Sequence, residues 1–175
     1  DETSPVYVAA EAGHAACIKV LHDQGADVNK CNNDEASVVY VAAYEGHAEC
    51  IKVLHDLGAD VNKCRYDGVS PVHAAAYAAY EGNVECIKLL HNVGADINRL
   101  DNIGRPPLST AVLRDETESV YTLIRLGAQL HLLTEYEGEG EDNESVPSFI
   151  RSVLSFSTRT TERMNMLHPS GQYRS

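Results

Sequence analysis

Cysteine and histidine recur at fixed positions along this 175-residue chain, and both residue types can bind metal ions or take part in catalysis. Blocks that begin Cys-Ile-Lys and end Leu-His start at Cys17, Cys50 and Cys86. Cys31 and Cys64 follow the first two blocks at equal distances. The five thiols are therefore candidates for disulfides, for a metal site or for reduced side chains.

The spacing favours reduced thiols. The three blocks are separated by 33 and then 36 residues, so equivalent cysteines belong to successive copies of one unit. Stacked helices lie about 8–10 Å apart, whereas a disulfide requires Cα atoms within about 7 Å. The odd number of cysteines points the same way. We expect buried, reduced thiols in a protein of the cytoplasm or nucleus.

Histidine repeats in the same manner at His22, His55 and His91. Zinc ligands must lie about 2 Å from the ion, and residues one unit apart cannot meet at one metal. We therefore predict no metal site, and instead a partly buried, hydrogen-bonded row of histidines. Burial opposes protonation of an imidazole, so this row would make stability depend on pH.

Motifs of catalysis are missing from the sequence. It contains no glycine-rich phosphate loop, no Gly-x-Ser-x-Gly and no His-Glu-x-x-His. The repeat accounts for the spacing of cysteine, histidine and acidic residues better than an active site does. We predict no catalytic residues, no cofactor and no enzymatic activity.

Each unit contains the signals of two helices. A serine suited to an N-cap opens the unit, an alanine-rich helix follows, and a glycine ends it. Pro5 and Pro71 stand at the first helical position, where a missing N–H costs nothing. One such unit cannot bury its apolar face alone, so neighbouring units must stack. The predicted N-caps are Ser4, Ser37 and Ser70, the glycines that end the first helix are Gly13, Gly46 and Gly82, and those that close the second are Gly25, Gly58 and Gly94.

The order of these motifs resembles the ankyrin repeat family. Each unit reads Ser-Pro-Val-Tyr/His or a close variant, then Ala-Ala, Gly-His (Gly-Asn in the third unit), an apolar helix and Gly-Ala-Asp-Val/Ile-Asn. The resemblance covers residues 1–130 and implies an all-α solenoid of helix-turn-helix units with hairpin-like fingers. It also implies a role in protein binding. The predicted parts are repeats at 1–36, 37–69 and 70–105, a degenerate capping repeat at 106–130, and an acidic linker, short amphipathic helix and disordered tail at 131–175.

Two departures from the pattern affect these expectations. Three extra residues between His73 and Gly82 should lengthen the first helix of the third repeat or make it bulge. In the fourth repeat Asp115 and Glu116 replace Gly-His, and Thr122 stands at an inward position. The chain opens in register with a repeat boundary, so we expect further repeats before its first residue.

Charge limits the partners. The chain carries 14 basic and 26 acidic residues, a net charge of −12, which repels nucleic acids and anionic membranes. No apolar stretch reaches the roughly 20 residues of a membrane span, and no signal peptide is visible. We expect a monomer that binds a protein or peptide with a basic patch.

The ankyrin resemblance implies a concave binding face made of finger tips and first helices. Tyrosine is a frequent contact residue, and here it alternates with carboxylates. Two interpretations remain open: a passive interaction module, and a regulatory or inhibitory subunit of an enzyme or transcription factor, gated by its tail and the apolar stripe from Phe149 to Leu154. The face comprises Glu11, Ala12, Asn33, Asp34, Tyr44, Glu45, Tyr66, Asp67, Tyr80, Glu81, Asn102, Ile103, Leu113 and Arg114.

Three asparagines, Asn29, Asn62 and Asn98, close the Gly-Ala-Asp-Val/Ile-Asn motif. Their surroundings are similar to those in which ankyrin repeat asparagines are hydroxylated in animal cells. The alternative is that each amide holds the turn of its finger. The usual histidine slot near the start of each unit holds Tyr7 and Tyr40 in the first two repeats, and we expect both to be half-buried.

Overall fold

The computed structural model describes residues 3–78 and 83–130, and within them the chain forms eight α-helices and no strands. The acidic linker, helix and tail predicted for 131–175 lie outside the described residues. The helices are α1 (Pro5–Glu11), α2 (Ala15–Asp23), α3 (Val38–Tyr44), α4 (Ala48–Asp56), α5 (Pro71–Tyr77), α6 (Asn83–Asn92), α7 (Pro107–Leu113) and α8 (Thr117–Arg125).

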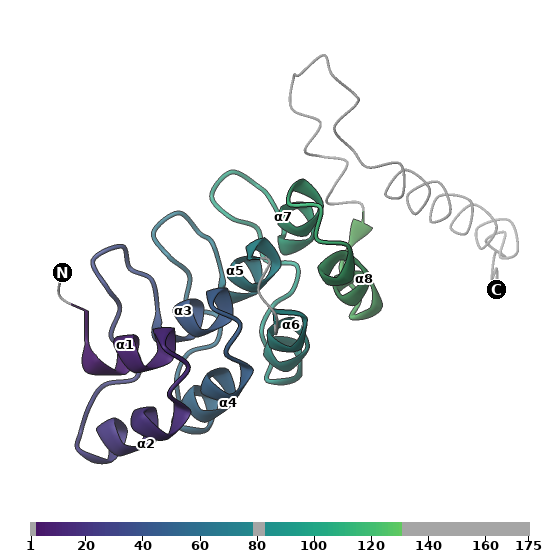
Figure 1. The fold of residues 1–175 in the computed structure, drawn as a ribbon. Helices are drawn as coiled ribbons and strands as arrows, with labels where there is room; N and C mark the ends of the chain where they lie inside the picture. The colour runs from purple at the N-terminus through teal and green to yellow at the C-terminus, as the bar shows by residue number, and fades with distance from the viewer. Residues whose placement is uncertain (1–2, 79–82, 131–175) are drawn as a thin grey trace, which may run out of the picture. The chain divides into compact units, whose positions relative to one another are not determined.

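The helices form antiparallel pairs that stack side by side (Figure 1). The first helices α1, α3, α5 and α7 contact one another in order, and the second helices α2, α4, α6 and α8 form a parallel row. Aliphatic side chains between the two rows make the core, among them the fully buried Ile18, Ile51, Leu54, Ile87 and Leu90. The predicted all-α repeat solenoid is confirmed.

The predicted caps position the first helices. In α1, α3 and α5 the side chain of the preceding serine accepts a hydrogen bond from the third helical N–H, and a proline opens α1 and α5. After α1 and α3 the chain turns through Gly13 and Gly46, whose φ angles of 75° and 78° favour glycine. Gly82 lies outside the described residues.

The insertion in the third repeat does not lengthen its first helix. Helix α5 has seven residues, as α1 and α3 do, so the predicted lengthening is wrong. The chain leaves the helix at Ala78, which is extended, and the extra residues therefore follow Tyr77. Consequently Tyr77 takes the place that Tyr44 has in α3. At the start of α6 the buried Asn83 donates hydrogen bonds to the carbonyls of Ala75 and Ala78, at 3.0 and 2.7 Å.

The fourth repeat keeps the fold with altered residues. Asp115 adopts the left-handed conformation of the missing glycine, with φ 59°, and Glu116 is the N-cap of α8. Thr122 is 8% exposed, so the prediction of a polar residue at an inward position is confirmed.

The fingers between repeats are closed like hairpins. Backbone hydrogen bonds of 2.9–3.1 Å join Asn32 to Ala36, Arg65 to Val69 and Asp101 to Arg105. Each loop contains one residue with positive φ at the same position. These residues are Glu35 (57°), Gly68 (82°) and Gly104 (82°).

Glu35→Gly should stabilise the protein by about 0.5–1 kcal/mol, because Glu35 is an exposed side chain held in the left-handed region that glycine occupies without strain. Urea unfolding followed by circular dichroism measures the gain. Glu49→Gly, in the first turn of α4, provides the opposite control and should destabilise. A lower unfolding midpoint for Glu35→Gly would contradict this account of the finger.

Candidate functional site

One slot in the first helix of each repeat reaches the finger that follows. The Tyr7 hydroxyl accepts a hydrogen bond from Asn32 Nδ2 at 3.2 Å, and the Tyr40 hydroxyl accepts one from Arg65 Nη1 at 3.4 Å. Tyr40 is half-buried as predicted, whereas Tyr7 is buried. Burial is the main cause that raises the pKa of Tyr7 to about 12, and the negative charge of Glu11 is the second. The hydroxyl therefore keeps its proton.

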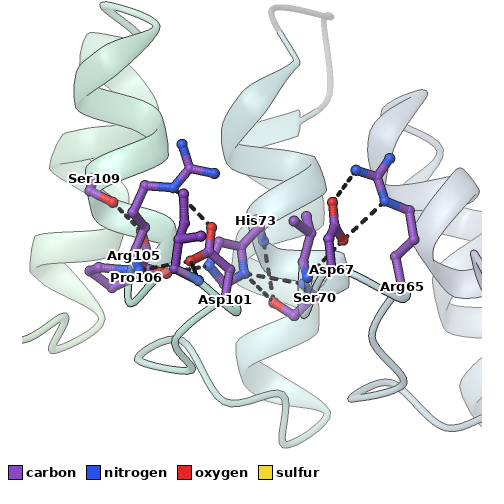
Figure 2. Close-up of polar contacts among 10 residues, drawn as sticks. Arg65, Asp67, Ser70, His73, Asp101, Arg105, Pro106 and Ser109 are labelled. Atoms are coloured by element: carbon purple, nitrogen blue, oxygen red, sulfur yellow. Dashed lines mark hydrogen bonds and ion pairs between the residues drawn. The ribbon is translucent and has the colours of Figure 1, made fainter.

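In the third repeat the slot holds His73, which is 1% exposed. Figure 2 shows its ring between Ser70 and Arg105. Its Nδ1 accepts the backbone N–H of Ser70 at 3.2 Å, which assigns the ring proton to Nε2, and Nε2 donates to the Arg105 carbonyl at 2.9 Å. Burial lowers the pKa of His73 and outweighs the Arg105 carbonyl, which favours the proton. His73 is therefore a neutral, structural link between α5 and the next finger.

Two arginine–aspartate pairs order the fingers (Figure 2). Arg65 donates from both Nε and Nη2 to the Asp67 carboxylate, and this pairing lowers the pKa of Asp67. Arg105 Nε lies 2.9 Å from Asp101 Oδ2. Burial alone would raise the pKa of Asp101, but hydrogen bonds from the backbone and side chain of Arg105 lower it. Both aspartates are therefore already engaged within the protein.

A groove of about 560 Å³ lies along the first helices and the fingers. It touches all four repeats, so no single repeat forms it. Its lining residues are Tyr7, Glu11, Asn32, Asp34, Ala36, Tyr40, Val41, Tyr44, Glu45, Arg65, Asp67, Val69, His73, Ala74, Tyr77, Asp101, Arg105, Thr110, Leu113 and Arg114.

Aromatic contacts run along the groove from the second repeat to the fourth. The rings of Tyr44 and Tyr77 stack with their centroids 6.1 Å apart and their planes 21° from parallel. The Arg114 guanidinium lies over the Tyr77 ring, 4.4 Å from its centroid, which is cation–π geometry. Tyr77 nevertheless remains 43% exposed, so this row presents aromatic surface to a ligand.

The structure brings part of the predicted face together. Glu11, Asp34, Tyr44, Glu45, Asp67, Leu113 and Arg114 line the groove. Ala12, Asn33, Tyr66, Asn102 and Ile103 are exposed but lie outside its lining, and Tyr80 and Glu81 lie outside the described residues.

Tyr66 and Asn102 instead take part in contacts within and between the fingers. Tyr66 is 63% exposed, with the Arg65 guanidinium 5.4 Å from its ring centroid. Asn102 donates from Nδ2 to the Tyr66 carbonyl at 3.1 Å. These two residues join one finger to the next.

Sequence reasoning missed several groove residues. Among them are Tyr7, Tyr40, Arg65, Tyr77 and Arg105. Tyr7 and Tyr40 occupy the position of the first helix whose side chain contacts the following finger. The sequence pattern of one helix does not reveal a contact with another repeat. Tyr77 was missed because the motif Tyr-Glu-Gly aligns Tyr80 with Tyr44. Placing the three inserted residues after the helix would have identified it.

The thiols and the histidine row differ from expectation. All five cysteines are unpaired, and Cys50 and Cys86 are buried, but Cys17 is exposed. Among the described residues α2 lies beside only one other second helix, α4, whereas α4 lies between α2 and α6. His22 and His91 are partly exposed and His55 is exposed. His22 Nδ1 has no hydrogen-bond partner, so the predicted hydrogen-bonded row is wrong.

Cys17 should therefore react with a thiol reagent such as dithionitrobenzoate at least about tenfold faster than Cys50 and Cys86 in the native protein. Burial raises the pKa of Cys50 to about 11 and that of Cys86 to about 12, so both thiols are protonated at neutral pH and shielded. Peptide mapping after a short labelling pulse measures the order. In urea the three thiols should react alike, and equal labelling without urea would contradict the burial pattern.

The asparagines that recur at the end of each unit join neighbouring units and do not hold their own turns. Asn29 Oδ1 accepts the Asp60 N–H at 2.9 Å, and its Nδ2 donates to the Gly58 carbonyl at 3.3 Å. Asn62 makes the same pair of bonds to the next unit, and Asn98 accepts the Gln129 N–H at 2.8 Å. The local turn is held by the aspartate two residues earlier. Hydroxylation of these asparagines stays a prediction.

No group of three or more histidine, cysteine, aspartate or glutamate side chains among the described residues is arranged to hold a metal ion. None of the described helices is long and apolar enough to cross a membrane.

Comparison with known families agrees with this architecture. The family model described as "Ankyrin repeats (3 copies)" matches residues 1–65, and the model described as "Ankyrin repeats (many copies)" matches residues 76–124. No curated protein shows significant similarity to the chain. The two matches together cover more than half of the sequence, and the stacked helix pairs, capping serines and fingers follow the same period, so the chain belongs to the ankyrin repeat family.

Proposed function

We propose that this protein is an interaction module whose groove binds a basic segment of a partner protein. Ankyrin repeats generally mediate protein–protein interactions. The observation that carries the proposal is the state of the groove carboxylates. Among the described residues Glu11, Asp34 and Glu45 form no ion pair, whereas Asp67 and Asp101 are each bound by an arginine.

Tyrosine rings lie beside these open carboxylates. Tyr7, Tyr40 and Tyr44 line the same half of the groove as Glu11 and Glu45. A lysine or arginine gains from a carboxylate at its charged end and from an aromatic ring along its aliphatic part or over its face. This half of the groove therefore supports binding of a cationic side chain.

The experiment uses a fluorescein-labelled (Lys-Ser-Gly)₃ peptide and fluorescence anisotropy. Glu11→Gln/Glu45→Gln should weaken its binding about tenfold, because each lost carboxylate removes about 0.5–1 kcal/mol of attraction. Raising NaCl from about 0.05 to about 0.5 M should weaken binding to the native protein. Glu11 is exposed, Glu45 is half-buried and neither belongs to the core, so folding should be retained.

A matched control separates the groove from the general acidity of the chain. Glu49→Gln/Glu118→Gln removes the same charge from exposed helix positions that do not line the groove. This double variant should bind the peptide as the native protein does. Equal losses in the two double variants would show nonspecific charge attraction and refute the groove.

A second candidate function, a regulator gated by its own tail, is favoured by charge. From Ser145 onward the chain carries four arginines and one acidic residue, Glu162, whereas the chain as a whole is strongly acidic. A basic tail suits the same carboxylates as a basic partner does. Arg151→Gln/Arg159→Gln/Arg163→Gln should then raise affinity for the lysine peptide, whereas unchanged affinity favours the ungated module.

We also propose a reducing compartment, the cytoplasm or nucleus, as the place of action. Five unpaired cysteines, one of them exposed, support this assignment because oxidising compartments convert such thiols to disulfides.

A further inference from the structure

The groove changes charge along its length. Its open carboxylates come from the first two repeats: Glu11 ends α1, Asp34 lies in the first finger, and Glu45 follows α3. At the other end, Arg114 follows α7 in the fourth repeat. A ligand that spans the groove therefore contacts negative charge at the first two repeats and positive charge at the fourth.

Arg114 differs from the other groove arginines. The guanidiniums of Arg65 and Arg105 are bound to Asp67 and Asp101, so their charge is neutralised within the fingers. Arg114 makes no ion pair with any described residue, and its guanidinium lies 4.4 Å from the centroid of the Tyr77 ring. A contact through its face leaves its in-plane N–H groups available, and these are the groups that bind a carboxylate.

The repeat fixes the distance between the two charges. Stacked helices lie about 8–10 Å apart, so Glu11 and Arg114, three helices apart, are separated by about 24–30 Å. Glu45 and Arg114 are two helices apart, about 16–20 Å. An extended peptide advances about 3.3 Å per residue, so these spans correspond to about eight and about five or six residues.

We propose that the groove recognises an extended segment with two basic residues about three positions apart and an acidic residue about five positions beyond the second. The basic residues bind at Glu11 and Glu45, and the acidic residue binds Arg114 on the Tyr77 ring. This inference rests on the proposed function and specifies its partner. The partner is an unfolded segment of another protein that is basic at one end and acidic at the other.

The test compares end-blocked, fluorescein-labelled peptides of one composition. The matched probe is Lys-Ser-Gly-Lys-Ser-Gly-Ser-Gly-Glu, and the short-spaced probe is Lys-Ser-Gly-Lys-Ser-Glu-Ser-Gly-Gly. Each is also made with its sequence reversed, because a peptide can lie in the groove in either chain direction. In one direction the matched probe should bind about five- to tenfold tighter than its short-spaced counterpart.

Arg114→Gln should abolish this preference and leave both probes with the weaker affinity. The control Arg125→Gln removes the same charge from an exposed residue of α8 outside the groove and should retain the preference. Arg114 is exposed, so neither variant removes packing from the core.

Equal affinities for matched and short-spaced probes in both directions would overturn the spacing inference while lysine-dependent binding still upheld the proposed function. A preference that survived Arg114→Gln would overturn the role of Arg114. Failure of the native protein to bind any lysine-containing probe would sink the proposed function itself, and the spacing inference with it.

Discussion

Lowering the pH from about 7 to about 5 should reduce the free energy of unfolding of this protein, and His73→Gln should remove most of that loss. Burial lowers the pKa of His73 in the folded state below its ordinary value of 6.5. Between those two pKa values the unfolded chain binds the proton that the folded chain refuses. The stabilisation is therefore complete above pH 6.5 and is lost as the pH falls toward the folded pKa.

The geometry explains why the proton is refused. Nδ1 already accepts the Ser70 N–H, so a second ring proton would face a donor inside the core. Among the described residues no acidic side chain is hydrogen-bonded to the ring, although Asp101 and Asp67 attract its proton from the neighbouring fingers. Both aspartates are ionised at pH 5 because their pKa values lie below 3.8, so their titration falls outside this window.

Urea unfolding of the native protein, His73→Gln and His14→Gln at several pH values from about 7.5 to about 5 measures the effect. His73→Gln should be less stable at pH 7.5 by about 2–3 kcal/mol, because Ser70 or Arg105 loses a buried partner. Its unfolding free energy should change little with pH. His14 is exposed, and its variant should keep the native slope. A slope that His73→Gln leaves intact would assign the pH dependence elsewhere.

The sequence predicted what the repeat determines. Serine caps, glycines and the alternation of two short helices are local features, so Ser37 and Gly46 could be placed from their neighbours alone. The period then implied stacking, because one helix pair leaves its apolar face uncovered. Burial of Ile51 and Leu54 between the rows follows from that argument.

The groove depends on side-chain contacts between residues of different repeats, and the sequence predicted these contacts less well. The link from His73 to the Arg105 carbonyl joins residues 32 positions apart, and no helical pattern marks it. The three-residue insertion made Tyr80, and not Tyr77, appear equivalent to Tyr44, so Tyr80 was predicted for the binding face. Cys17 was predicted to be buried from its equivalence to Cys50, but burial of this position requires a helix pair stacked on its outer side.

The second large effect is expected in the fingers, at Gly68. Gly68→Ala should destabilise the protein by about 3 kcal/mol, because a methyl group there meets two obstacles. Gly68 has φ 82°, which is strained for alanine, and the added Cβ would lie 2.5 Å from Asn102 Oδ1 and 2.7 Å from the Asn102 backbone nitrogen. Relieving that overlap would move one finger from the next.

Gly104→Ala is a closely matched control. Gly104 occupies the same position of the following finger with the same φ of 82°, but nothing lies within 4 Å of its added Cβ. It should cost only the conformational strain, about 1 kcal/mol. The difference between the two unfolding free energies, measured in urea, isolates the contact between fingers. Equal losses would mean that the fingers separate freely.

The same pair of variants connects the fold to binding. The Asn102 N–H donates to the Asp67 carbonyl at 3.0 Å, so displacing that finger disturbs the loop that holds Asp67 against Arg65. Arg65 and Asp67 both line the groove, so a displaced finger would change the shape of the surface that is proposed to hold the basic segment. At a temperature where both variants remain folded, Gly68→Ala should therefore bind the lysine peptide several-fold more weakly than Gly104→Ala. Equal affinities would show that the groove is insensitive to the contact between its fingers.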